Sequence, residues 1–163
     1  MDGIWLGLRL LLLLGLANTA PLVAKRWLGS RWPTPLDGGL KFVDGRPLLG
    51  ASKPVRGALV AINATALGAP ILGLPVTAGA MLGAGAMLGD ALSSFIKRRM
   101  GSAPSTRATG IDQIPEALVP LLFLQETLGL TWTQIAAITT VFFVLEIPLA
   151  WMSHRWGLRD QPF

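Results

Sequence analysis

Five long apolar stretches follow one another along the chain, and each is close to the length that a helix needs to cross a bilayer. A hydrocarbon core of about 30 Å takes roughly 20 apolar residues in helical form. The polar stretches between them are short except for 25–56 and 97–112. The pattern predicts an all-α protein that is a single integral membrane domain over residues 1–163, with spans at 4–24, 57–74, 76–96, 114–130 and 132–151.

Two connections and one end of the chain need separate interpretation. Residues 68–75, with the sequence GAPILGLP, predict a tight hairpin turn between the second and third spans. The first stretch contains Arg9 and a run of leucines, as a signal peptide does. No small-x-small cleavage site precedes a polar mature domain, so we interpret this stretch as a permanent span.

The composition supports membrane insertion and excludes several chemistries. Hydrophobic residues make up 52% of the 163 residues and charged residues only 14%, whereas a soluble domain has roughly 25% charged residues. The chain has no cysteine and a single histidine, His154. These counts exclude a disulfide scaffold, a thiolate metal site and a cysteine nucleophile, and they disfavour a zinc site of several histidines.

The positive charges predict the orientation of the bundle. Thirteen of the 14 lysines and arginines fall in 25–56, in 97–112 or in the C-terminal tail. With five spans these three segments share one side of the membrane, and the turns on the other side hold no positive charge. The positive-inside rule makes the charged side cytoplasmic, with the N-terminus outside and the C-terminus inside. We interpret the net charge of +5 as a signal of orientation rather than of nucleic-acid binding.

The third predicted span contains two small-residue motifs, Gly79-x-x-x-Gly83 and Gly85-x-x-x-Gly89. Small residues let helices approach closely in lipid, where no hydrophobic force drives them together. Close helix packing is therefore the favoured interpretation, and direct contact with a substrate is the alternative.

Asp90 is the only charged residue between Arg56 and Lys97. An acid within a span is costly and indicates a functional site by default. The alternative is a structural ion pair with a cytoplasmic arginine or lysine.

The spacing around Asp90 predicts a polar face on the third span. In a helix, Asp90, Ser94 and Lys97 lie on one face, with Ser93 beside them. Such a face suits a metal-bound phosphate whose other oxygens contact Lys97 and Arg98. Alternatively, the basic run is only an anchor at the cytoplasmic surface.

Asp112 opens the fourth span and offers a second carboxylate close to the first. Mg²⁺ binds to one or two carboxylates together with waters and substrate phosphates, so Asp90 and Asp112 are candidate magnesium ligands. The alternative for Asp112 is an ordinary helix N-cap. If Asp112 is only a cap, Asp37 and Asp44 are the next candidates for the second ligand.

The loop at 35–56 is longer than a connection requires, and long ordered loops are usually functional. Its glycines allow backbone N–H groups to approach phosphate, and its bases neutralise phosphate charge. The alternative is a solvated cytoplasmic loop. The candidate substrate-binding residues, to which we add the polar Asn18 of the first span and Ser93, are Asp37, Gly38, Gly39, Lys41, Asp44, Gly45, Arg46, Lys53 and Arg56.

Three strings of the sequence resemble the CDP-archaeol synthase family: LDGGLKFVDGRPLLGASKPVRG at 36–57, GDALSSFIKRRMG at 89–101 and IDQIP at 111–115. That family consists of five-span, CTP-dependent cytidylyltransferases related to the CDP-diacylglycerol synthases. The resemblance implies that CTP and a lipid phosphate give a CDP-activated lipid and pyrophosphate, with Mg²⁺ as the cofactor. It also implies a location in the cell membrane.

The resemblance further implies roles for individual residues. Asp90 and Asp112 correspond to the metal-binding aspartates, Ser94, Lys97 and Arg98 to the catalytic element, and the loop to the part that closes over the nucleotide. One departure is that Pro54 stands after Lys53 where the family has threonine, which indicates a branch with a different lipid substrate.

The expected partners are CTP, a lipid phosphate and membrane lipids, with no nucleic acid and with a homodimer left open. The competing class is a non-enzymatic transporter or structural subunit, for which an internal repeat would be expected. An alcohol phosphotransferase would need a denser set of aspartates. The residues leave open whether the lipid tails are ether-linked isoprenoids or acyl esters.

Overall fold

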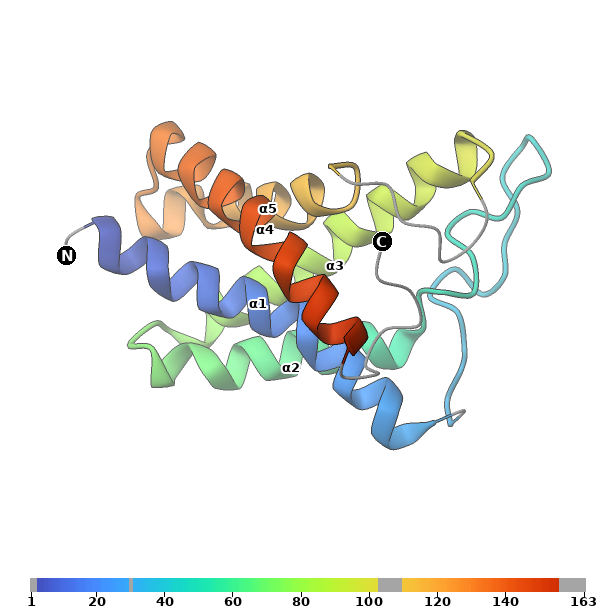
Figure 1. Cartoon of the computed structure of the whole chain (residues 1–163), viewed down its shortest axis with the longest axis horizontal. Coiled ribbons are helices and arrows are strands. Elements are labelled where there is room, and N and C mark those ends of the chain that lie inside the picture. The colour runs from blue at the N-terminus through green and yellow to red at the C-terminus, as the bar shows by residue number, and fades with distance from the viewer. Residues whose placement is uncertain (1–2, 30, 103–109, 156–163) are drawn as a thin grey trace.

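The computed structural model describes residues 3–29, 31–102 and 110–155, apart from the side chains of residues 150, 153 and 154. These residues form five α-helices and confirm the all-helical prediction (Figure 1). The helices are α1 (Gly3–Leu28), α2 (Val55–Ile71), α3 (Val76–Arg99), α4 (Gln113–Leu128) and α5 (Trp132–Arg155). Part of the predicted loop at 97–112 and the C-terminal tail lie outside the described residues.

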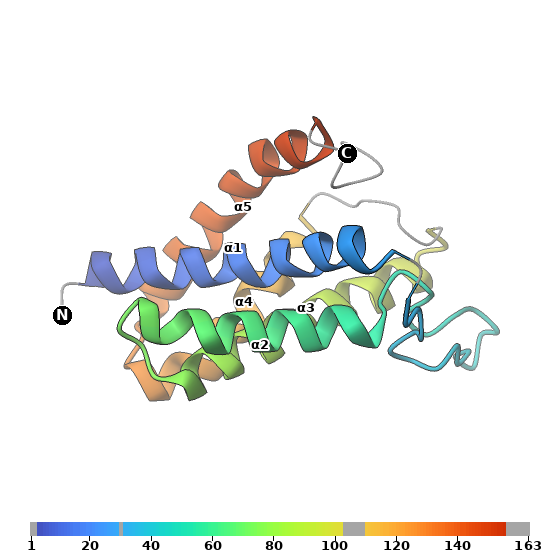
Figure 2. The same ribbon diagram turned by 90° about the horizontal axis from the view of Figure 1, so that it is seen from below.

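Helix α3 is the centre of the bundle, because it packs against α1, α2 and α4. Helices α1 and α2 run side by side along the long axis, while α5 crosses them obliquely (Figures 1 and 2). The loop from α1 to α2 lies at one end of the bundle, beside the C-terminus of α3. Leucines of α1, α3 and α4 fill the core between the helices, among them Leu10, Leu13, Leu14, Leu82, Leu121 and Leu124.

Three of the helices are long and apolar enough to cross a membrane: α1, α3 and residues 132–149 of α5. Helix α2 has 17 residues and α4 has 16. At 1.5 Å per residue they extend roughly 25 Å, which is at the lower limit of a bilayer core. The predicted second and fourth spans are thus helices, but shorter than the other three.

The turn between α2 and α3 is shorter than the sequence predicts. Helix α2 continues to Ile71 with Pro70 inside it, so only residues 72–75 form the turn. Gly68, which we expected in the turn, lies in the helix against Leu16 of α1. Pro70 is tolerated so close to the end of α2 because the N–H that it lacks costs the last turn only one hydrogen bond.

The small residues of α3 serve helix packing, as predicted. A Cβ atom on Gly79 or Gly83 would overlap Thr65 of α2, and a Cβ on Gly89 would overlap the backbone of Pro115 in α4. On Gly85 it would lie 2.6 Å from the Cα of Pro120. The glycines therefore allow α2 and α4 to reach the backbone of α3, and this close approach fixes where the polar end of α3 lies.

Candidate active site

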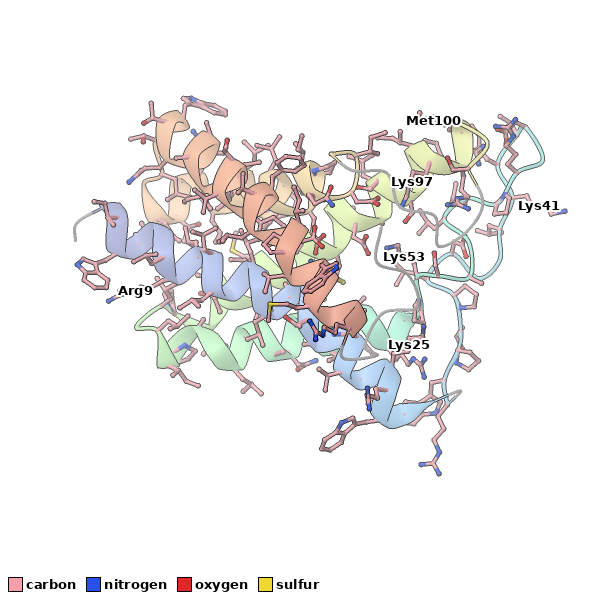
Figure 3. The ribbon with its side chains drawn as sticks, viewed as in Figure 1. Arg9, Lys25, Lys41, Lys53, Lys97 and Met100 are labelled. Carbon is pink, nitrogen blue, oxygen red and sulfur yellow. The ribbon has the colours of Figure 1, made fainter. Side chains whose placement is uncertain are left out.

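Asp90 is paired with a lysine from the long loop. The Lys53 Nζ lies 2.5 Å from both carboxylate oxygens of Asp90. About a quarter of each side chain is exposed, 23% for Lys53 and 25% for Asp90. Figure 3 places Lys53 and Lys97 at the end of the bundle where the loop meets α3, and Arg9 at the opposite end. The ion pair that we considered as the alternative for Asp90 is therefore present.

Asp112 forms a second pair of the same kind. Its Oδ1 lies 2.6 Å from the Nζ of Lys97. The Asp112 carboxylate makes no capping hydrogen bond to α4, and its backbone is already in the helical region. Gln113 instead accepts a hydrogen bond from the Gly110 N–H at 2.7 Å. The N-cap alternative for Asp112 is thus wrong, because its charge is directed to Lys97.

The residues of α3 that follow Asp90 are buried even though they are polar. The exposed fraction is 6% or less for each of Ser93, Ser94, Lys97 and Arg98. The Ser93 hydroxyl donates to the Gly89 carbonyl at 2.9 Å and lies 3.4 Å from the carbonyl of Asp112. The predicted polar face exists, and it is enclosed by α4 and the loop.

Arg98 lines a cavity beside this face. In the described part of the chain its Nε and Nη1 have no hydrogen-bond partner, although only 3% of the residue is exposed. The cavity has a volume of about 240 Å³ and is lined by Arg46, Pro47, Arg98, Gly101 and Ser102. A buried guanidinium without hydrogen-bond partners is costly, and two arginines line this cavity, so the cavity suits an anion.

Asp37 organises the loop from inside. Its carboxylate accepts hydrogen bonds from the N–H groups of Leu49, Gly50 and Gly39, at 2.8, 3.0 and 2.9 Å. Burial acts to raise the pKa of Asp37, but these three hydrogen bonds outweigh it and lower the pKa below its ordinary value of 3.8. Gly38 and Gly39 adopt positive φ angles next to it. Because its oxygens accept three hydrogen bonds within the loop, Asp37 is a weaker candidate for the second metal ligand than Asp112.

Arginines fasten the loop to the end of α3. The Arg46 Nη1 donates to the carbonyls of Arg98 and Arg99, at 3.3 and 2.6 Å. Arg99 in turn donates to the Pro47 carbonyl at 2.6 Å, pairs with Asp44 and lies over the ring of Phe42. Asp44 is thereby occupied, and its partners Arg46 and Arg99 lower its pKa despite the opposing effect of desolvation.

The remaining candidates are distributed around the same end of the bundle. Lys41 is exposed on the loop, and Gly45 turns the chain with a φ of 77°. Arg56 donates to the Gly29 carbonyl at 2.7 Å and also to that of Arg31, so it holds the loop to the end of α1. Asn18 is partly buried on α1. The structure therefore brings Lys53, Asp90, Ser93, Ser94, Lys97, Arg98, Asp112 and Arg46 to the junction of α3, α4 and the loop.

Pro54 fits its position without loss. It is the extended residue before α2, with φ of −77° and ψ of 147°. The loop bonds around it use the carbonyl of Lys53 and the N–H of Val55, so the N–H that proline lacks is not needed.

Three buried polar residues of α4 and α5 are not among the residues that the sequence singled out. Gln113 is 1% exposed, Glu116 7% and Glu146 5%. The rule that singled out Asp90, an acid in an apolar span, applies equally to Glu146. The spacing of Asp112 and Glu116, four residues apart at the start of α4, was a second available signal.

The two carboxylates of the site fit a hard cation that takes its other ligands from water and substrate. Among the described residues no group of three or more acidic, histidine or cysteine side chains could hold a metal. Two carboxylates are present, however, and a lysine ammonium occupies the position of a cation at each. One or two carboxylates are what Mg²⁺ takes from a protein when waters and substrate phosphates supply the other ligands.

Comparison with known proteins assigns the family. Residues 72–163 match the family described as "CarS-like: CDP-archaeol synthase". The CDP-archaeol synthase of Sulfurisphaera tokodaii is 35% identical over 80% of this chain and 82% of its own length. That of Hyperthermus butylicus is 41% identical over 60% of this chain and 59% of its own. The chain belongs to the CDP-archaeol synthase family.

A solved structure agrees with this assignment. It is described as an intramembrane enzyme for archaeal membrane lipid biosynthesis, and it covers 86% of this chain and 90% of its own at 28% identity with a TM-score of 0.74. The resemblance seen in the sequence is thus confirmed, and with it the expectation that the chain is an enzyme, a cytidylyltransferase of lipid metabolism.

Proposed function

We propose that this member of the CDP-archaeol synthase family transfers CMP from CTP to a membrane lipid phosphate, with Mg²⁺, and releases pyrophosphate. The observation that carries the proposal is a cluster at one end of an apolar bundle. It consists of the pairs Lys53–Asp90 and Lys97–Asp112 and of the buried guanidinium of Arg98, two nitrogens of which have no partner among the described residues. The cluster can bind phosphates, and it lies at the end of helices that can contact lipid. A transporter or a structural subunit would not need it.

The chain's own residues position and neutralise the reactants. An oxygen of the lipid phosphate forms a bond to the α-phosphorus of CTP, and the bond from that phosphorus to the pyrophosphate oxygen breaks. The attacking oxygen is already ionised, so no residue has to remove a proton. Lys53, Lys97 and Arg98 hold phosphate oxygens, which is the main requirement of phosphoryl-type transfer. The loop fastened by Arg46 and Arg99 covers part of the cluster.

Asp90 and Asp112 would hold Mg²⁺ in this scheme. The bound cation supplies polarisation of the α-phosphate and neutralisation of the leaving pyrophosphate. Ser94 lies on the same stretch of α3 and would orient the reactants through its hydroxyl, while the Ser93 hydroxyl donates to the Gly89 carbonyl and supports this stretch of the helix.

The proposed orientation places the cluster at the cytoplasmic surface of the cell membrane, where CTP is available. Residues 25–56 and the end of α3 carry ten of the 14 lysines and arginines, and the turns at the other end carry none. The lipid tails stay in the bilayer. The names of the related proteins support an archaeol-type ether lipid as the acceptor in preference to an acyl ester.

The deciding experiment measures pyrophosphate release by the purified protein in lipid nanodiscs with Mg²⁺. Ether-linked and ester-linked lipid phosphates are supplied in parallel, each with CTP or with ATP. We expect release with CTP and the ether lipid, and a preference over ATP of about 10² or more, since a base pocket penalises unpaired polar groups. Equal turnover of ATP and CTP, or release without any lipid phosphate, would contradict the proposal.

A further inference from the structure

The two lysine–aspartate pairs differ in the element to which the lysine belongs and in how exposed the lysine is. Lys97 lies on α3 itself and is nearly buried, whereas Lys53 comes from the loop and is 23% exposed. The Lys53 ammonium is equally close to both oxygens of Asp90, at 2.5 Å. It therefore occupies the place from which a divalent cation would bind to this carboxylate.

The backbone of Lys53 is held by hydrogen bonds of the loop, and only its side chain reaches Asp90. The Lys53 carbonyl accepts a hydrogen bond from the Leu36 N–H at 2.7 Å, and the Val55 N–H donates to the Thr34 carbonyl at 2.9 Å. These bonds hold the residue at the entrance of α2, next to the site. A lysine has a flexible four-carbon stem, so its ammonium can leave Asp90 without a change in the loop.

We propose that Lys53 is a displaceable counter-ion that neutralises Asp90 until a divalent cation binds, and then contacts the nucleotide phosphates. This inference rests on the proposed function and adds to it a coupling between cation and CTP. Asp90 remains charged but paired in the free enzyme, so a partly buried carboxylate is never left without a cation.

The coupling follows from what happens to the displaced ammonium. Without nucleotide, a cation on Asp90 leaves the Lys53 charge close to a like charge and without its partner. With nucleotide, the phosphates accept the ammonium. The cation therefore binds weakly alone and more tightly with CTP, and by linkage CTP binds more tightly with the cation.

The experiment measures binding of Mn²⁺, as a spectroscopic substitute for Mg²⁺, by the loss of its free-ion electron paramagnetic resonance signal. The protein is in nanodiscs, with or without the α,β-methylene analogue of CTP. For Lys53→Met we expect Mn²⁺ to bind about tenfold more tightly without nucleotide, and the enhancement by the analogue to fall by a similar factor. Asp90→Asn should weaken Mn²⁺ binding in both conditions.

Two control variants separate this role from a general effect of charge. Lys53→Arg keeps a cation beside Asp90 and should restore the weak nucleotide-free binding of the wild type. Lys25→Met removes the same charge from the exposed end of α1 and should leave Mn²⁺ binding unchanged. Lys53→Gln, checked for folding by circular dichroism, replaces Lys53→Met if that variant does not fold.

The failure of this inference can be told apart from the failure of the proposed function. If folded Lys53→Met binds Mn²⁺ no more tightly than the wild type, the counter-ion role is overturned while CTP-dependent pyrophosphate release still stands. If the wild type releases no pyrophosphate, the proposed function fails whatever the Mn²⁺ titrations give. Tighter binding in Lys25→Met as well would also overturn the specific role of Lys53.

Discussion

At the end of α3, side chains of opposite charge lie close together and are largely buried. Asp90 contacts Lys53, Asp112 contacts Lys97, and two buried nitrogens of Arg98 have no hydrogen-bond partner among the described residues. Charge pairs of this kind add little to stability once desolvation is counted, so stability alone does not explain them. Phosphate binding does explain them, because it needs cations held in place and carboxylates that can accept a metal.

A first residue-scale prediction concerns the two carboxylates. Asp90→Asn and Asp112→Asn should each abolish turnover in a folded protein, because the amide keeps the size but removes the charge that holds a hard cation. The double variant should be no worse than either single variant, since one loss already empties the site. Initial rates of pyrophosphate release measure this. A nearly wild-type Asp112→Asn enzyme would require another second ligand.

The pKa of Asp37 gives a second prediction at this scale. Because the folded pKa lies below the ordinary value of 3.8, the loop gains stability from Asp37 above that value and loses it as pH falls through the folded pKa. Hydrogen exchange of the Leu49 and Gly50 amides, corrected for the intrinsic rate, should be level from pH 7 to 5 and accelerate below about pH 4. Asp37→Asn should remove this pH dependence, and an unchanged profile in that variant would refute the assignment.

At the scale of the elements, α3 is held by glycines that admit neighbouring backbones. The clearest is Gly89, whose missing Cβ leaves room for Pro115 at the start of α4. Because Asp90 and Asp112 lie next to this contact, the distance between α3 and α4 sets the geometry of the cluster. Packing and chemistry therefore depend on the same few residues of the two helices.

Gly89→Ala tests this dependence. The added methyl must push α4 away from α3, and such overpacking typically costs about 1–3 kcal/mol. Gly15→Ala is the matched control, because nothing lies within 4 Å of its Cβ position and alanine is the better helix former by up to about 1 kcal/mol. We expect a lower thermal midpoint and lower activity for Gly89→Ala only. Equal midpoints for the two variants would show that the helices separate without cost.

At the scale of the whole molecule, all the described site residues lie at one end of the bundle. The loop of 29–54, the C-terminus of α3 and the N-terminus of α4 meet there, and Arg9 lies at the other end (Figures 1 and 3). This separation gives the molecule one charged end and one apolar body, as a membrane enzyme with a water-soluble co-substrate requires.

The predicted orientation can be tested directly because the chain has no cysteine. Val43→Cys lies at an exposed point of the loop and Ile71→Cys near the turn between α2 and α3, where the residues are 93% and 85% exposed. A membrane-impermeant maleimide added to intact cells should label Ile71→Cys and not Val43→Cys. The opposite pattern would reverse the orientation, and labelling of both after cell lysis is the control for reactivity.

The sequence by itself determined the features that depend on runs of residues. The lengths of the apolar stretches predicted most helix ends to within a few residues. They could do so because each apolar residue gains from burial in lipid independently of its distant neighbours. Clustered charges and three motifs pointed to Asp90, Asp112, Lys97 and the loop, and the family was identified from them. The turn at 68–75 was misplaced because the pattern does not show where the last helical turn packs.

Tertiary structure alone decided which charges meet. Lys53 pairs with Asp90, which lies 37 positions further along the chain. Arg46 donates to the backbone carbonyl of Arg99, which lies 53 positions further along. No local pattern specifies such partners, since they follow from the close approach that Gly79, Gly83 and Gly89 allow. The same packing turned Asp37 inward and placed Asp112 beside Lys97. A buried charge is costly unless it is paired or hydrogen-bonded, and only the folded structure decides which partner lies within reach.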